Sequence, residues 1–197
     1  MTNRLCFAAA ISAAALLSAC QQREEPAANE TVEANAPAMA NEAAPAAAQS
    51  AQLVDANGKA IGQVAISEDA NGVTLKVTAA GLPAGTHGVH LHEKGMCEGP
   101  KFESAGAHWN PATKQHGRDN PMGAHLGDLA NMEAADGAEA SSTYLVAGVT
   151  VGGATNALAD ADGTSLVVHA KADDYKTDPS GNSGDRIACA VLAPPKG

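Results

Sequence analysis

The chain has 197 residues, and its 22 Asp and Glu outnumber its 12 Lys and Arg, which gives a formal net charge of −10. Such an acidic chain presents no basic stretch, which excludes a general nucleic-acid-binding protein. Two Phe, one Trp and two Tyr are its only aromatic residues, so a core must be built mainly from Val, Leu, Ile and Ala.

Residues 1–19 have the features of an export signal. Arg4 precedes an apolar run over residues 7–19, which is too short to span a bilayer as a stable helix. The run ends in Leu17-Ser18-Ala19-Cys20, a pattern typical of lipoproteins, in which the cysteine is lipidated and becomes the new N-terminus. The alternative is an ordinary signal peptide with an incidental Cys20. Lipidation predicts a periplasmic or cell-envelope protein, and Gln21 favours the outer membrane where a cell has two.

Residues 20–50 have the composition of a disordered tether. The segment is rich in Ala, Pro, Glu and Asn, and Val32 is its one branched apolar side chain. It cannot bury enough apolar surface to offset the entropy of ordering. We therefore expect an acidic tether at 20–50 and one folded domain at 51–197, which is an ordinary domain size.

Strand patterns dominate this domain. Residues 63–67 and 73–78 alternate apolar and polar side chains, and Asp69-Ala70-Asn71-Gly72 between them predicts a hairpin turn. Further short strands are expected at 88–92, 144–151, 165–169 and 186–192. No helical period persists, so the pattern predicts an all-β sandwich or barrel. Two long connections remain, at 93–128 and 170–185, and loops of that length are either disordered or functional.

All seven histidines lie between His87 and His169. His90 and His92 are two residues apart on an expected strand, so both side chains project from one face and could chelate a metal. Taken alone, such a pair is weak evidence for a metal site, because surface or hydrogen-bonded histidines give the same pattern. His87 has the opposite parity and is expected to be structural.

The first long loop adds His108, His116, His125 and Asp128, and three imidazoles with one carboxylate suit tetrahedral zinc. Any one of these residues could have a structural role. Together with His90, His92 and His169 they predict one metal site, because loops rarely gather so many imidazoles without a ligand.

Two cysteines, Cys97 and Cys189, remain in the domain. A pair in an exported protein favours a disulfide, and two metal-binding thiolates are the weaker alternative.

Several motifs together resemble copper/zinc superoxide dismutase over about residues 52–192. They occur in the family's order, and they are His87-Gly88-Val89-His90-Leu91-His92-Glu93, Ser104-Ala105-Gly106-Ala107-His108-Trp109-Asn110-Pro111, His116-Gly117, His125-Leu126-Gly127-Asp128-Leu129, Leu166-Val167-Val168-His169, Lys171-Ala172-Asp173-Asp174 and Gly184-Asp185-Arg186-Ile187-Ala188-Cys189. The resemblance implies an eight-stranded Greek-key β-barrel or sandwich with two long functional loops.

The resemblance also implies a role for each matching residue. Copper would be bound by His90, His92, His108 and His169, and zinc by His108, His116, His125 and Asp128. His108 would bridge the metals as an imidazolate, and Asp173 would link a copper-ligand histidine to a zinc-ligand histidine, here His90 and His116. Cys97 and Cys189 would form the family disulfide, and Arg186 would guide the anion.

The implied activity is dismutation of superoxide to oxygen and hydrogen peroxide, with copper cycling between Cu(II) and Cu(I), in protection of the cell envelope. The acidic net charge opposes an anionic substrate, so Arg186 would have to act locally, with Lys101, Lys171 or Lys176 as candidate helpers. A homodimer fits the family, although the loops that carry subunit contacts differ in length here.

Two other functions fit parts of the sequence. A lipid-anchored, non-enzymatic copper-binding or copper-delivery module would reuse the fold, but it is expected to have lost a zinc ligand, the bridge or the arginine. A zinc-only site would leave His90, His92 and His169 unexplained.

Overall fold

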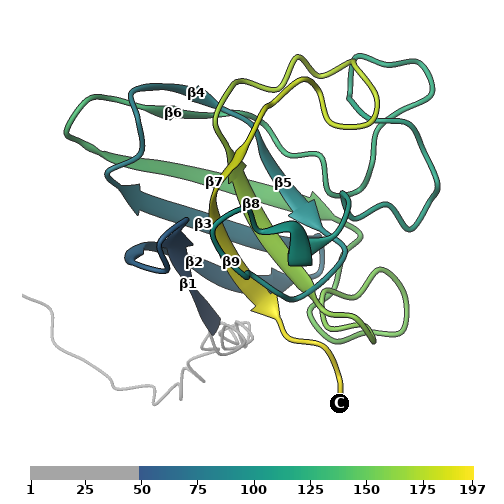
Figure 1. Ribbon diagram of the computed structural model, residues 1–197. Helices are drawn as coiled ribbons and strands as arrows, with labels where there is room; N and C mark the ends of the chain where they lie inside the picture. The colour runs from purple at the N-terminus through teal and green to yellow at the C-terminus, as the bar shows by residue number, and fades with distance from the viewer. Residues whose placement is uncertain (1–48) are drawn as a thin grey trace, which may run out of the picture. The chain divides into compact units, whose positions relative to one another are not determined.

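The computed structural model describes residues 49–197, and nearly all of the regular structure in this range is β-strand (Figure 1). The strands are β1 Gln49–Asp55, β2 Ala60–Asp69, β3 Gly72–Ala80, β4 Gly85–His87, β5 Val89–His92, β6 Met132–Ala134, β7 Glu139–Ala147, β8 Thr164–His169 and β9 Arg186–Ala193, with a 3-10 turn, η1, at Glu103–Ala105. The all-β prediction is confirmed. Within residues 49–197, no helix is long and apolar enough to cross a membrane.

Seven strands form one antiparallel sheet in the order β5-β8-β9-β1-β2-β3-β7, and β4 pairs with β6 in a second, two-stranded sheet. The predicted hairpin joins β2 to β3, where Asp69 faces Gly72 and the Asp69 carboxylate accepts the N–H of Asn71 at 2.7 Å. Gly72 has φ of +142°, which a residue with a Cβ rarely adopts. The large sheet curls around a core made mainly of Val and Leu, as composition required.

The strand prediction missed three strands, β1, β4 and β6, and misplaced one. β4 and β6 have three residues each, too few to show a period of two. β7 spans Glu139–Ala147 rather than 144–151, because Gly148, at φ of +70°, ends it. Its first half alternates through small residues whose burial the sequence does not reveal. Gly88 lies between β4 and β5, so the strand predicted at 88–92 begins one residue too early, and the strand count in this range is nine.

The first strand begins inside the predicted tether. Gln49 and Ser50 pair with Ile66 and Ala65 of β2, so the fold includes two residues more than the predicted domain. The predicted signal peptide, Cys20 and the rest of the tether lie outside the described residues.

Both predicted long connections are present, between β5 and β6 and between β8 and β9. Figure 1 shows the yellow-green β8–β9 connection beside the teal one, and Asp119 donates its N–H to Tyr175 O between them at 2.9 Å. The predicted disulfide joins Cys97 in the first connection to Cys189 on β9. The two loops are therefore held over one end of the strands that carry the histidines.

Candidate metal centre

Six histidines and one aspartate lie close together where the two long connections meet the sheet. His90 and His92 project from β5, and His169 ends the neighbouring strand β8. The backbones of His108 and His92 form an isolated antiparallel β-bridge, which places the first loop against the same strand. All six histidines are buried, with at most 8% of any of them exposed.

Four of these imidazoles converge on one point. One possible ligand atom from each of them lies within 4.8 Å of the other three, and the four residues are His90, His92, His108 and His169. Each also has one buried nitrogen without a hydrogen-bond partner, and these atoms are His90 Nδ1, His92 Nε2, His108 Nε2 and His169 Nε2. Buried polar atoms are rarely left unpaired in native proteins, so four that face one another fit a metal ion.

Hydrogen bonds on the opposite ring nitrogens fix how three of these imidazoles are protonated. His92 Nδ1 lies 3.0 Å from Gly106 O, and His169 Nδ1 lies 3.1 Å from Gly184 O. His90 Nε2 lies 2.8 Å from the Asp173 carboxylate. Because those partners can only accept, each of these nitrogens carries the proton. The unpaired nitrogen then presents the lone pair that a metal binds.

A second group surrounds Oδ1 of Asp128. Three Nδ1 atoms lie near this oxygen, at 3.1 Å for His108, 3.0 Å for His116 and 3.2 Å for His125. His108 Nδ1 and His125 Nδ1 are 3.4 Å apart. A tetrahedral zinc site with bonds of about 2.0 Å has ligand atoms about 3.3 Å apart, so these spacings fit zinc.

His90 also lies close to Asp128. One possible ligand atom from each of His90, His108, His116 and Asp128 lies within 4.8 Å of the other three. The rings of His90 and His108 are tilted by 32° with centroids 4.0 Å apart, which brings His90 close to both groups. However, His90 Nε2 is already paired with Asp173, and its Nδ1 belongs to the four unpaired nitrogens. We therefore assign His125, whose Nδ1 contacts Asp128 directly, to the second group.

His108 is common to both groups. Its Nδ1 faces Asp128, and its Nε2 is one of the four unpaired nitrogens of the first group. The two ring nitrogens of one imidazole thus point at two candidate metal positions.

Asp173 connects the groups by a second route. Its Oδ2 pairs with His90 Nε2 at 2.8 Å, and its Oδ1 pairs with His116 Nε2 at 2.9 Å. These are the two histidines that the sequence assigned to it. Carboxylate partners of this kind orient a ligand imidazole and raise its basicity.

Burial and charge set the protonation of the metal-free site. Burial lowers the pKa of His90 and His92, and it lowers those of His108 and His169 to about 4 and about 3. These imidazoles are therefore neutral at pH 7 and available to a metal.

The pKa of His116 moves in the opposite direction. Burial alone would lower it, but hydrogen bonds to Asp128 and Asp173 raise it to about 9. Burial likewise opposes ionisation of both carboxyls, yet their hydrogen bonds with histidines hold the pKa of each well below its usual range. A cation entering the second group would therefore displace the His116 proton.

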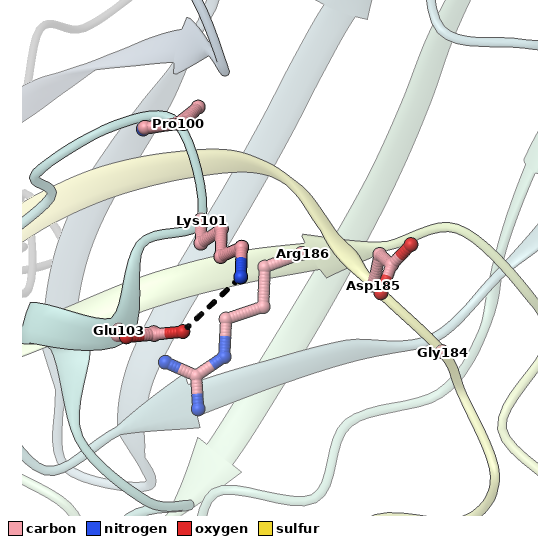
Figure 2. A pocket seen from close by; sticks show the side chains of 6 residues that line it. All are labelled: Pro100, Lys101, Glu103, Gly184, Asp185 and Arg186. Carbon is pink, nitrogen blue, oxygen red and sulfur yellow. Dashed lines mark ion pairs between the residues drawn. The ribbon is translucent and has the colours of Figure 1, made fainter.

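Arg186 pairs with His169 across β8 and β9, and it lines a pocket of about 500 Å³ (Figure 2). The pocket is lined by Pro100, Lys101, Glu103, Gly184, Asp185 and Arg186. The guanidinium donates to Phe102 O at 2.6 Å and to Gly106 O at 2.7 Å. Of the three candidate lysines, Lys101 alone lines this pocket, where its amine is 3.9 Å from the Glu103 carboxylate.

Sequence reasoning missed several residues that hold the ligands. Asn131 and Tyr175 bind Asp173, and Asp178 accepts the N–H of His116 at 2.6 Å. The carbonyls of Gly106 and Gly184 have no signature in residue type, so no pattern could have found them. His87 lies outside both groups, with its ring nitrogens 2.7 Å from His169 O and 2.8 Å from Pro83 O, in the structural position expected of it.

Comparison with known proteins identifies the family. The model for copper/zinc superoxide dismutase matches residues 60–192. The superoxide dismutase-like protein YojM of Bacillus subtilis is 45% identical over 149 residues, covering 72% of this chain and 74% of that protein. The Cu-Zn superoxide dismutase of Caulobacter vibrioides is 47% identical over 139 residues, covering 69% of this chain and 80% of that protein.

Solved structures of superoxide dismutase-like proteins also resemble this chain. A superoxide dismutase-like protein from Bacillus subtilis, in a double mutant with a tyrosine and a proline replaced by histidine, matches with a TM-score of 0.72. The two are 41% identical, and the match covers 75% of this chain and 99% of that one. The chain therefore belongs to the copper/zinc superoxide dismutase family, whose two metals suit the histidine groups found here.

Proposed function

We propose that this protein dismutates superoxide to oxygen and hydrogen peroxide. In this proposal copper is bound by His90, His92, His108 and His169, and zinc by His108, His116, His125 and Asp128. The observation that carries it is the position of His108, with one ring nitrogen in each group. A zinc-only site would leave the four unpaired nitrogens without a role.

Copper held by these four histidines would supply the one-electron chemistry that dismutation requires. The four imidazoles suit both oxidation states of copper, because imidazole is a ligand of intermediate softness. Three of them are held by acceptors on their far nitrogens, so they can keep their orientation through the cycle.

Reduction of superoxide to hydrogen peroxide consumes protons, and we assign the nearest proton site to His108 Nε2. This atom has no hydrogen-bond partner and belongs to the copper group. Its sister atom Nδ1 stays on the Asp128 group, which fixes the ring while Nε2 takes up and releases a proton. Zinc would contribute positive charge at Nδ1, which favours release of that proton.

Arg186 is the residue to which we assign attraction of the anion. Its guanidinium donates to Gly106 O, which also contacts His92 Nδ1, and it lines a pocket that Lys101 also lines. A local cation is needed because the chain as a whole carries a net charge of −10.

We further propose that the protein works in the cell envelope, anchored through lipid on Cys20. The lipoprotein pattern at residues 17–20 supports this location. A disulfide within the fold fits an oxidising compartment. Metabolic labelling with a fatty-acid analogue, followed by fractionation of the wild type and of Cys20→Ser, tests the anchor. Equal recovery of both in the soluble fraction would rule it out.

The test of the activity is metal analysis combined with a superoxide assay on the same preparation. We expect one copper and one zinc per chain, and consumption of superoxide that cyanide inhibits. Stoichiometric copper and zinc without that consumption would refute the enzyme and favour the alternative, a non-enzymatic copper-binding or copper-delivery module.

A further inference from the structure

Tyr175 lies outside both metal groups, yet it contacts three segments that surround them. Its hydroxyl accepts the backbone N–H of Asn131 at 2.7 Å, and its own N–H donates to Asp173 Oδ1 at 2.7 Å. Its carbonyl accepts the N–H of Asp119 at 2.9 Å. One residue thus joins the β8–β9 connection to two parts of the β5–β6 connection.

The contact with Asn131 closes a ring of hydrogen bonds around Asp173. The Asn131 amide donates to Asp173 O at 3.0 Å, and its oxygen accepts the Asp173 N–H at 2.9 Å. The backbone of Asp173 is therefore fixed by a side chain whose own backbone is held by the Tyr175 hydroxyl. This arrangement sets where the Asp173 carboxylate stands between His90 and His116.

The outer side of Tyr175 is covered by Arg118, whose Cζ lies 3.7 Å from the ring centroid. A guanidinium stacked on a phenol ring is favourable and limits access of water to the ring. Tyr175 also has φ of +61°, a left-handed backbone conformation that is unfavourable for a residue with a Cβ. The three hydrogen bonds and the stacking hold it there.

We propose that Tyr175 is a positioning residue for the second metal group. Through Asp173 it fixes the His116 imidazole and so slows release of the metal held around Asp128. This inference rests on the proposed zinc site. The effect falls on the zinc side because Asp173 Oδ1 accepts from both Tyr175 and His116, while the other oxygen serves His90.

Tyr175→Phe is the informative variant. It removes the hydroxyl but keeps the ring under Arg118, so the part-buried Asn131 N–H loses its partner and the Tyr175 backbone, whose N–H binds Asp173 Oδ1, is held less firmly. Tyr144→Phe is the matched control, because the chain has only two tyrosines. Tyr144 is buried on β7, and its hydroxyl has no hydrogen-bond partner among the described residues.

The full chain is loaded with copper and with cobalt(II) in place of zinc, because tetrahedral cobalt(II) absorbs in the visible. Loss of each metal's absorbance is then followed after mixing with excess EDTA. We expect cobalt to leave Tyr175→Phe about fivefold faster than wild type, less than the roughly tenfold or more typical of losing a direct partner of a metal ligand, because the hydroxyl acts through Asn131 and Asp173. Tyr144→Phe should match wild type, and copper release should be unchanged in both.

A merely structural tyrosine would give a different pattern. Cobalt release within about twofold of wild type, or equal acceleration for copper and cobalt, would overturn the inference, because general loosening of the loops is not selective. A wild-type chain that binds no cobalt would instead refute the proposed zinc site and this inference with it, whereas a chain that binds both metals but consumes no superoxide would refute the proposed enzyme alone.

Discussion

His92 and Arg186 share one acceptor, the carbonyl oxygen of Gly106. The His92 Nδ1 lies 3.0 Å from it and the Arg186 Nη2 lies 2.7 Å from it. The cation that we assign to anion attraction is thereby held in a fixed relation to a proposed copper ligand. The loop that carries Gly106 is in turn tied to β9 through Cys97 and Cys189. A long loop can therefore position a charge beside the metal group without regular structure of its own.

Removing the Arg186 charge should lower the superoxide rate while both metals stay bound. We expect Arg186→Ala to react about tenfold more slowly at low ionic strength and to lose most of its salt dependence, since steering by a local charge acts on the rate of encounter. Stopped-flow decay of superoxide at several salt concentrations measures both effects. Lys76→Ala, which removes an exposed cation on β3, is the control. A rate for Arg186→Ala equal to that of the control would exclude steering.

Asp128→Asn should empty the zinc group and spare the copper group. Asp128 Oδ1 contacts three Nδ1 atoms, and its Oδ2 accepts the N–H groups of Gly117 and His125. Loss of a direct ligand should weaken zinc binding by more than about 100-fold, beyond the usual effect of losing an outer partner. Elemental analysis after dialysis against zinc and copper would show copper retained and zinc lost. Full retention of zinc would mean that Asp128 is not a ligand.

The sequence predicted which residues gather at the candidate metal centre better than it predicted the strands. Histidine is rare and chemically specific, so six imidazoles with strand and loop spacing could be assigned without a structure. The start of β7 could not, because Ala140, Ser141 and Ser142 carry little hydrophobic signal although Ala140 is buried. Buried small residues and exposed small residues look alike in a sequence.

Most of the residues that orient the candidate ligands could not be predicted from the sequence. Gly106 and Gly184 act through carbonyl oxygens, which every residue has. Asn131 and Tyr175 become relevant only when the two long loops are brought together. Asp173 was assigned through the family resemblance, since spacing alone gives no reason to place it between His90 and His116.

The stability of the metal-free protein should fall on acidification below neutrality. Burial lowers the pKa of His108 to about 4 and of His169 to about 3, whereas unfolded histidine titrates near 6.5. Below pH 6.5 the unfolded chain therefore binds protons that the folded chain does not. The stabilisation from these neutral imidazoles is complete above pH 6.5 and is lost as the pH falls toward 4 and 3.

His116 makes the stability depend on pH in the opposite direction. Its pKa is raised to about 9, so its contribution is complete below pH 6.5 and is lost as the pH rises through 9. Urea unfolding of the metal-free protein at pH 5, 7 and 9 should give the highest midpoint at pH 7. A midpoint at pH 5 equal to or above that at pH 7 would contradict the assignment of buried neutral histidines.

Gly181 should be the least replaceable glycine of the β8–β9 connection. A Cβ there would lie 1.8 Å from Asp173 Oδ1 and 2.6 Å from His116 Nε2, directly on the hydrogen bond between them. Gly181→Ala should therefore displace the carboxylate, reduce zinc retention and lower the urea midpoint. Gly137→Ala is a matched control: its φ of +67° is close to the +63° of Gly181, but a Cβ there meets nothing within 4 Å.

The two glycine variants separate the backbone penalty from the effect on the site. Both should lose about 1 kcal/mol because alanine disfavours positive φ. Only Gly181→Ala should also release zinc to a chelator faster than wild type, by about tenfold or more, since it breaks the Asp173–His116 contact. Equal zinc retention in both variants would show that Asp173 can move without loosening His116, and that the carboxylate does not control the second metal group.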